Sequence, residues 1–284
     1  MSVPKHLDPD PQVEATRVAA PSGELAALLA TPGSGVERRR GVLLVPGYTG
    51  SKEDFWHLLP LLAHSGRPAT AIDLRGQYDS GGPEDVNAYS IDALAADVAS
   101  LLNSAEEELH LVGHSFGGLI CRAAVLSGAP VRSLTLLGSG PGALGGTRAM
   151  LVDAMRPMLA NGGGVPEVWE ATAALNAAAT ALQPPAVQAF IKRRFLASPA
   201  AALLGMGEAV TTAVDRTNEL AKSDVPVLVA CGENDDAWSP AEQEDMALRL
   251  GARFVTFAAA GHSPNVDVPD AVIATLEDFW SRLD

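Results

Sequence analysis

Ser115 stands between two glycines at the end of an apolar run. Its surroundings, GHSFG at residues 113–117, follow the pattern Gly-x-Ser-x-Gly, and an apolar helical pattern begins directly after the serine. Such a strand-to-helix turn lifts the serine hydroxyl above the edge of a sheet. The two glycines relieve the crowding that so tight a turn creates. The turn also places the backbone N–H of Phe116 at a helix N-terminus, where it can stabilise an oxyanion. Ser115 is therefore the candidate nucleophile.

A serine hydroxyl needs a general base, and the base needs an acid to orient it. Of the six histidines, His262 stands apart because it follows an apolar segment, residues 252–259, and comes directly after Gly261. An earlier apolar segment, residues 225–232, is followed by Asp235 and Asp236. Serine, aspartate and histidine thus occur in this order, each after a predicted strand. That order predicts a Ser–His–Asp triad built at one edge of a parallel sheet.

Only one of the two adjacent aspartates is expected to face His262. Neighbouring side chains after a strand end point in different directions. A shift of the turn by one residue would exchange the roles of Asp235 and Asp236, so the local pattern alone leaves both open.

The elements that must position these residues alternate along the chain. Apolar runs of strand length occur at 41–46, 68–74, 108–113, 131–138, 225–232 and 252–259, and helical patterns at 51–66, 90–104, 116–128, 240–251 and 269–283. This alternation predicts an α/β fold with a mostly parallel sheet and helices on both faces. The segments near 13–19 and 24–31 are predicted to form an antiparallel pair at the edge of that sheet.

Residues 143–222 interrupt the alternation. This stretch is far longer than one crossover helix needs. It is rich in alanine, shows helical apolar spacing, and is broken at 161–164 and 183–185. We expect a helical cap inserted into a sheet domain made of residues 1–142 and 223–284.

Composition limits the classes of partner. The formal net charge of −14 repels phosphate backbones and anionic membranes, so nucleic acid is not expected as a partner. No segment approaches the roughly 20 apolar residues needed to cross a bilayer. The polar, proline-rich N-terminus lacks a signal-peptide core, so a cytoplasmic protein is expected. No clustered metal ligands or phosphate-binding loop occur, and we expect neither a metal nor an organic cofactor.

Five stretches make the chain similar to the α/β-hydrolase superfamily over nearly its whole length. They are VPGYTGSKEDF (45–55), DLRGQYDSGGPED (73–85), LVGHSFGGL (111–119), GENDDAWSP (232–240) and GARFVTFAAAGHSPNVDVP (251–269). The resemblance implies that the backbone N–H of Tyr48 is the second oxyanion donor and that Asp235 is the acid of the triad. Two stretches depart from the common pattern, since Pro46 replaces a histidine and GQYDS replaces Gly-His-Gly-x-Ser.

The predicted function is a serine hydrolase that cleaves a carboxylic ester of a small or medium apolar acyl substrate. An acyl-enzyme on Ser115 is expected as the intermediate. Thioester hydrolysis, acyl transfer and carbon–carbon bond hydrolysis on the same triad remain alternatives, and a ligand receptor is the alternative of another class. Dehalogenase and epoxide hydrolase activities are disfavoured, since such relatives have an aspartate at the position of Ser115. None of the three tyrosines lies in the cap, where epoxide hydrolases use them.

The substrate pocket is expected to have a hydrophobic roof supplied by the cap. Met206 and Trp169 are expected to line it from the cap, and Trp238 because it follows the acid loop. A proline-type aminopeptidase would need carboxylates in the cap to hold an amine. Glu167, Glu170 and Glu208 are available, but their helical spacing favours solvated positions.

Overall fold

A computed structural model describes residues 2–8, 10–160, 164–175 and 181–284. Its centre is one open sheet of eight strands in the order β1-β2-β4-β3-β5-β6-β7-β8. The strands are β1 (Val13–Ala20), β2 (Gly23–Ala30), β3 (Val42–Val45), β4 (Ala69–Ile72), β5 (Leu109–His114), β6 (Val131–Leu137), β7 (Val227–Gly232) and β8 (Arg253–Phe257). β2 pairs antiparallel with β1 and β4, and the other pairings are parallel. The predicted sheet and its antiparallel edge pair are confirmed.

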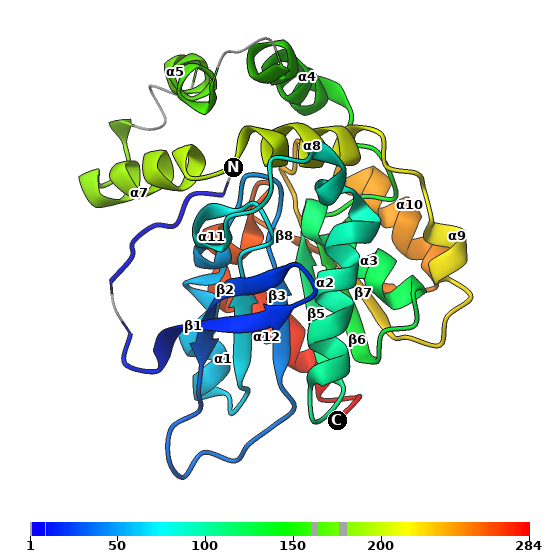
Figure 1. The fold of residues 1–284 in the computed structure, drawn as a ribbon. Helices are drawn as coiled ribbons and strands as arrows, with labels where there is room; N and C mark the ends of the chain where they lie inside the picture. Colours follow the sequence, from blue (N-terminus) through cyan, green and yellow to red (C-terminus); the bar gives the residue numbers. More distant parts are fainter. Residues whose placement is uncertain (1, 9, 161–163, 176–180) are drawn as a thin grey trace.

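Helices cover both faces of the sheet (Figure 1). One face carries α1 (Leu58–His64) and α12 (Pro269–Trp280), and the other carries α2 (Ile91–Ser104), α3 (Phe116–Leu126) and α10 (Pro240–Leu250). Shorter helices are α11 (Pro264–Asp267) and the 3-10 turns η1 (Lys52–Phe55), η2 (Tyr78–Ser80) and η3 (Val86–Tyr89).

The helix expected over 51–66 forms two pieces, η1 and α1. Pro60 falls in the first turn of α1, where its missing N–H has no helical partner to lose. Proline thus fixes where this helix can begin.

The segment between β6 and β7 is helical, as expected. Its described helices are α4 (Gly146–Ala160), α5 (Val165–Leu175), α7 (Pro185–Leu196), α8 (Ala200–Thr211) and α9 (Thr217–Leu220). Figure 1 shows α4, α5, α7 and α8 together at the top of the molecule, whereas α9 lies beside α10. The break expected at 161–164 falls outside the described residues except for Gly164. The division into core and cap at 143 and 222 stays a prediction.

α8 differs from α4, α5 and α7 because it is packed into the main core. Ala201, Ala202, Met206 and Val210 belong to the apolar cluster that also contains Tyr89 and Phe116. A Cβ at Gly205 would meet the Val86 carbonyl oxygen at 2.5 Å, so the helix touches η3 backbone to backbone. α8 therefore connects the outer helices to the sheet.

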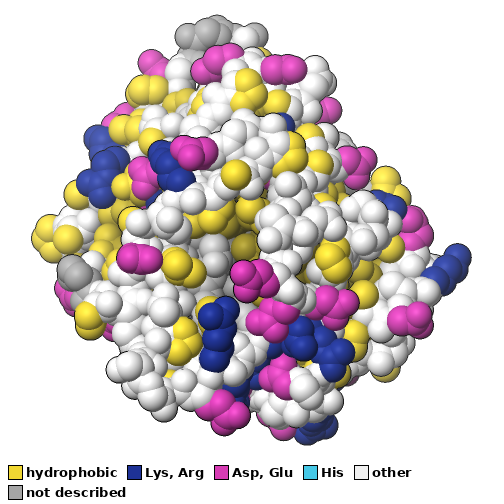
Figure 2. Space-filling view, turned by 60° about the horizontal axis from the view of Figure 1, so that its bottom comes forward, with side chains coloured by type: hydrophobic (Ala, Val, Ile, Leu, Met, Phe, Trp, Pro, Cys, Tyr) yellow, Lys and Arg dark blue, Asp and Glu magenta, His cyan; other side chains and the backbone are white. Residues whose placement is uncertain are grey.

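Charged side chains are mostly paired. Acidic and basic groups lie next to one another over the face in Figure 2. Buried ion pairs include Lys52 with Asp73 at 3.0 Å and Arg194 with Asp54 at 2.7 Å. Within the described ranges, no helix is long and apolar enough to span a membrane.

Candidate active site

Ser115 occupies a strained turn between β5 and α3. Its φ of 55° and ψ of −123° lie in a region that side-chain-bearing residues rarely adopt. The turn is held by the Ser115 N–H, which donates to the Leu137 carbonyl at 2.9 Å. A Cβ at Gly117 would meet the carbonyl oxygen of Val45 at 2.4 Å, and one at Gly113 would meet that of Gly117 at 2.5 Å. Both glycines are therefore required by the close approach of backbone.

The structure brings Ser115, His262 and Asp235 together as a hydrogen-bonded chain. His262 Nε2 lies 2.9 Å from Ser115 Oγ, and His262 Nδ1 lies 2.8 Å from Asp235 Oδ1. Because an ionised carboxylate only accepts, Nδ1 carries the imidazole proton. Nε2 is then the acceptor for the serine hydroxyl, which is the tautomer that a general base needs.

The carboxylate of Asp235 is held from three sides. Its Oδ1 also accepts from the Ala237 N–H at 3.0 Å, and its Oδ2 accepts from the Gln243 side chain at 3.0 Å. Burial raises the pKa of Asp235, but the hydrogen bonds and charge of its partners, His262 first, outweigh burial and leave that pKa below its ordinary value. Asp235 is thus an oriented anion beside the imidazole.

Burial lowers the pKa of His262, and the positive charge of Arg148 lowers it further, against the opposing effect of Asp235. The net shift is downward. The imidazole is consequently neutral near pH 7, the state in which it can accept a proton.

Asp236 points away from the histidine. Its side chain is 66% exposed and pairs with Arg148 of α4, whose Nε and Nη2 both donate to Oδ1, at 2.9 and 2.6 Å. The two adjacent aspartates therefore have different surroundings, and the geometry places Asp235 at His262.

Two backbone N–H groups close to the serine have no hydrogen-bond partner in the described part of the chain. They belong to Tyr48, after β3, and to Phe116, the first residue of α3. A Cβ at Gly47 would meet Ser115 Cβ at 2.9 Å, so glycine lets the loop before Tyr48 approach the nucleophile. The Tyr48 hydroxyl donates to the Leu203 carbonyl of α8 at 2.9 Å, which ties this loop to the helices above.

Three further side chains support the site, and the sequence singled out none of them for this role. Gln243 holds Asp235, as described above. Gln77 Nε2 donates to the Gly47 carbonyl at 2.8 Å. His114 Nε2 lies 2.8 Å from the His262 carbonyl and therefore donates to it; burial lowers the pKa of His114 to about 3, so its ring is neutral. Only the departure of GQYDS from its usual form pointed to Gln77.

A cavity of about 170 Å³ opens beside Ser115 and His262. Its apolar lining comes mainly from α4 and neighbouring segments and includes Leu144, Leu151, Val152, Met155, Phe195 and Val210. This volume is below the roughly 300–1,000 Å³ of pockets for drug-sized ligands. A small acyl group fits such a space better than a long chain.

The three residues expected to line the pocket do not line this cavity. The Trp238 ring is 1% exposed and packs against Gly140, and its Nε1 donates to the Ala143 carbonyl at 3.3 Å. Met206, 2% exposed, points into the main core. The Trp169 ring packs against Phe195, with the ring centroids 5.6 Å apart, and is not part of the cavity lining. These expectations were wrong because apolar spacing indicates that a side chain is buried, but not whether it faces the cavity or packs into the core.

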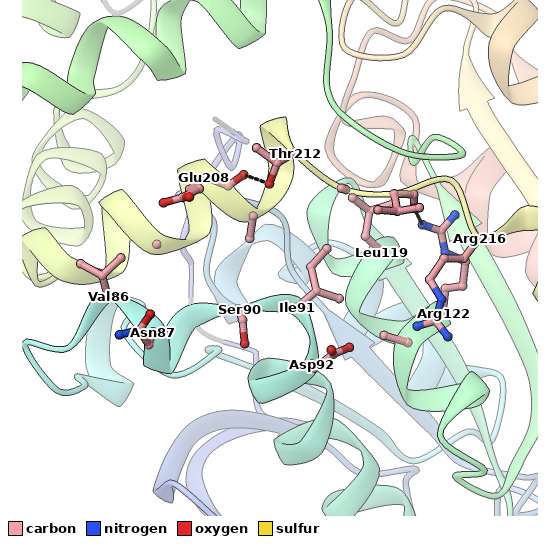
Figure 3. A pocket seen from close by; sticks show the side chains of 15 residues that line it. Val86, Asn87, Ser90, Ile91, Asp92, Leu119, Arg122, Glu208, Thr212 and Arg216 are labelled. Carbon is pink, nitrogen blue, oxygen red and sulfur yellow. Dashed lines mark hydrogen bonds between the residues drawn. The ribbon is translucent and has the colours of Figure 1, made fainter.

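A larger cavity of about 600 Å³ lies between α2, α3 and α8 (Figure 3), and its lining excludes Ser115, Asp235 and His262. Its two arginines are already engaged. Arg122 donates to the carbonyls of Pro141 and Val214, and Arg216 pairs with Glu219 at 2.7 Å. This cavity is larger than the one beside Ser115, but the nucleophile and base line the smaller one, which we take as the candidate site.

The sequence profile of the "Alpha/beta hydrolase family" matches residues 42–275, and the chain belongs to this family. Over 80 residues it is 35% identical to "Epoxide hydrolase A" of Mycobacterium tuberculosis, which covers 28% of this chain and 25% of that protein. The matched region spans a quarter or less of the curated relatives.

Solved structures share the fold. A hydrolase from Pseudomonas aeruginosa PA01 gives a TM-score of 0.76 at 24% identity, covering 93% of this chain and 97% of the other. The enol-lactonase from Burkholderia xenovorans LB400 gives 0.75 at 22% identity, covering 94% and 100%. At this level of identity the likeness concerns the fold.

Proposed function

We propose that this protein hydrolyses a carboxylic ester of a small acyl substrate through an acyl-enzyme on Ser115. The observation that carries the proposal is the continuous chain from Ser115 Oγ to His262 Nε2 and from Nδ1 to Asp235. A serine oxygen, a neutral base and an ionised acid in this order form the arrangement that activates a hydroxyl at neutral pH.

Acylation begins when the Ser115 oxygen attacks the ester carbonyl carbon while His262 Nε2 takes the hydroxyl proton. The negative charge that develops on the carbonyl oxygen is met by the N–H groups of Tyr48 and Phe116. The imidazolium, stabilised by Asp235, then protonates the departing alkoxide. The alcohol leaves, and the acyl group stays on Ser115.

Deacylation repeats the sequence with water. His262 takes a proton from the water molecule, whose oxygen attacks the acyl carbonyl, and then returns the proton to Ser115 as the carboxylic acid departs. The small volume beside Ser115 supports a short acyl group. The fold shared with an enol-lactonase is compatible with this proposal, since a lactone is a cyclic ester.

Epoxide hydrolysis is the second candidate, because part of the chain is similar to an epoxide hydrolase. Two features argue against it. A serine occupies the elbow where those enzymes have an aspartate, and tyrosines occur only at 48, 78 and 89, none of them between 143 and 222. Thioester hydrolysis and acyl transfer use the same machinery and are distinguished from ester hydrolysis by substrate alone.

The test combines 4-nitrophenyl esters of graded acyl length with a serine-directed phosphonate. Short esters should turn over fastest. The phosphonate should attach one phosphonyl group to the peptide that contains Ser115, and mass spectrometry should detect it. Ser115→Ala should lose both while its circular dichroism is unchanged. An initial burst followed by steady release identifies an enzyme, whereas one turnover with retained product would favour a receptor. Ester turnover near the wild-type rate in Ser115→Ala would contradict the nucleophile assignment.

A further inference from the structure

Among the described residues that line the cavity beside Ser115, Arg148 is the one cation. It lies in the first turn of α4, and the cavity wall next to it is apolar. The lining also contains one carboxylate, Asp54, but that group is buried and already accepts from Arg194 Nη1 at 2.7 Å. In the described part of the lining, the cavity therefore presents one positive group, and the one carboxylate there is already paired with Arg194.

The present partner of Arg148 is easily replaced. Asp236 lies outside the cavity, 66% exposed, and uses a single oxygen to accept from both Nε and Nη2. Nη1 makes no hydrogen bond to another residue in the described part of the chain. Exposed ion pairs of this kind contribute little to stability, because water solvates both partners when they separate. A planar guanidinium can instead bind a carboxylate through two parallel hydrogen bonds.

We propose that Arg148 recognises a carboxylate on the substrate, so that the preferred substrates are short esters that carry a free carboxylate a few bonds from the scissile carbonyl. This inference rests on the proposed ester hydrolysis. Leu151, Val152 and Met155 would contact the short hydrocarbon segment between the two groups. The net charge of −14 repels anions at long range, so a local cation is what an anionic ester needs in order to bind.

The ion pair offers two variants with opposite expected effects. The probes are 4-nitrophenyl hemiglutarate, which carries a carboxylate, and 4-nitrophenyl valerate, a neutral ester of the same chain length. The measured quantity is the ratio of kcat/KM for the anionic ester to kcat/KM for the neutral ester. Arg148→Met should lower this ratio roughly 10- to 100-fold, since a charge-assisted hydrogen bond is lost. Asp236→Asn should raise it, because the competing carboxylate is removed.

Arg148→Lys serves as the conservative control. It keeps the charge without the planar fork, and its ratio should fall between those of the wild type and Arg148→Met. Thermal unfolding of every variant checks that the fold is kept. An equal ratio in the wild type and in Arg148→Met would overturn the inference while leaving ester hydrolysis intact.

A binding measurement separates this inference from the proposed function. Calorimetric titration of Ser115→Ala with glutarate needs no turnover. Glutarate should bind, bind more weakly when Arg148→Met is added, and bind more tightly when Asp236→Asn is added. Absence of glutarate binding would contradict the carboxylate site. Failure of the wild type to hydrolyse either ester would contradict the proposed function instead.

Discussion

The side-chain amide of Gln77 donates a 2.8 Å hydrogen bond to the carbonyl oxygen of Gly47. That carbonyl belongs to the same planar peptide unit as the N–H of Tyr48, so fixing one end fixes the direction of the other. Gln77 is itself oriented, because its Oε1 accepts from the Leu74 N–H at 3.0 Å. Gln77 is therefore a positioning residue for one of the two proposed oxyanion donors.

Gln77→Met should lower kcat for short esters with little change in KM, since the donor matters most when charge develops on the substrate oxygen. The loss should be smaller than the roughly 100-fold cost of removing an oxyanion donor outright. Gln77→Glu has a similar shape but no side-chain N–H to donate, so it should lower kcat in the same way as Gln77→Met. Steady-state kinetics of both variants provide the measurement, and a rise in KM at constant kcat would show a role in substrate binding instead.

Asp235→Asn should lower turnover on the order of 10⁴-fold, because an amide donates to Nδ1 and favours the wrong imidazole tautomer. Asp236→Asn on a neutral ester should have a much smaller effect, since its side chain pairs with Arg148 rather than with His262. Both variants are compared on the valerate ester at one pH. The larger loss in Asp236→Asn would show that the loop positions the other aspartate.

The pH dependence of kcat/KM follows from the lowered pKa of His262. The base must be neutral, so activity is present above that pKa and lost as the pH falls through it. The midpoint of the acid limb is expected below the ordinary value of 6.5. Arg148→Met removes a charge that lowers the pKa of His262, so its midpoint should lie higher than in the wild type. The profile is measured on the neutral ester, and a wild-type midpoint above 6.5 would conflict with the buried geometry.

Hydrogen exchange should distinguish two layers above the sheet. α5 buries only Val165 and Val168, whereas α8 buries seven residues within the core and against its neighbours. Amides of α5 should therefore exchange faster than those of β3, β5 and β7, and amides of α8 should be protected almost as well as the strands. Equal protection of α5 and β5 would argue against a separable outer layer.

The contrast between Ser115 and Trp238 shows what the sequence can and cannot predict here. The positions of Ser115 and His262 follow from short local patterns, because a glycine-flanked turn or a loop after a strand is fixed by its immediate neighbours. Trp238 is also near such a loop, but whether its ring faces the cavity or Gly140 depends on packing against a distant segment. Local pattern carries no information on that choice.

The roles of the supporting residues could not be predicted from the sequence for the same reason. Gln243 reaches Asp235 from the next helix, and Gln77 reaches Gly47 across thirty positions of sequence. Their roles exist only once the strands are side by side. The mostly parallel sheet with its antiparallel edge pair was predictable, since the alternation of strand and helix patterns can be seen along the chain.

The strained conformation of Ser115 sets a limit on how heat-tolerant this protein can become without losing its chemistry. A non-glycine residue in such a region costs roughly 1–3 kcal/mol, which the surrounding fold must offset. Ser115→Gly would remove that cost, so the variant should be more stable to unfolding but catalytically inactive. Selection for thermal endurance alone would favour erasing the nucleophile. A serine at φ 55° therefore means that this protein gives up some folding stability in order to keep its nucleophile.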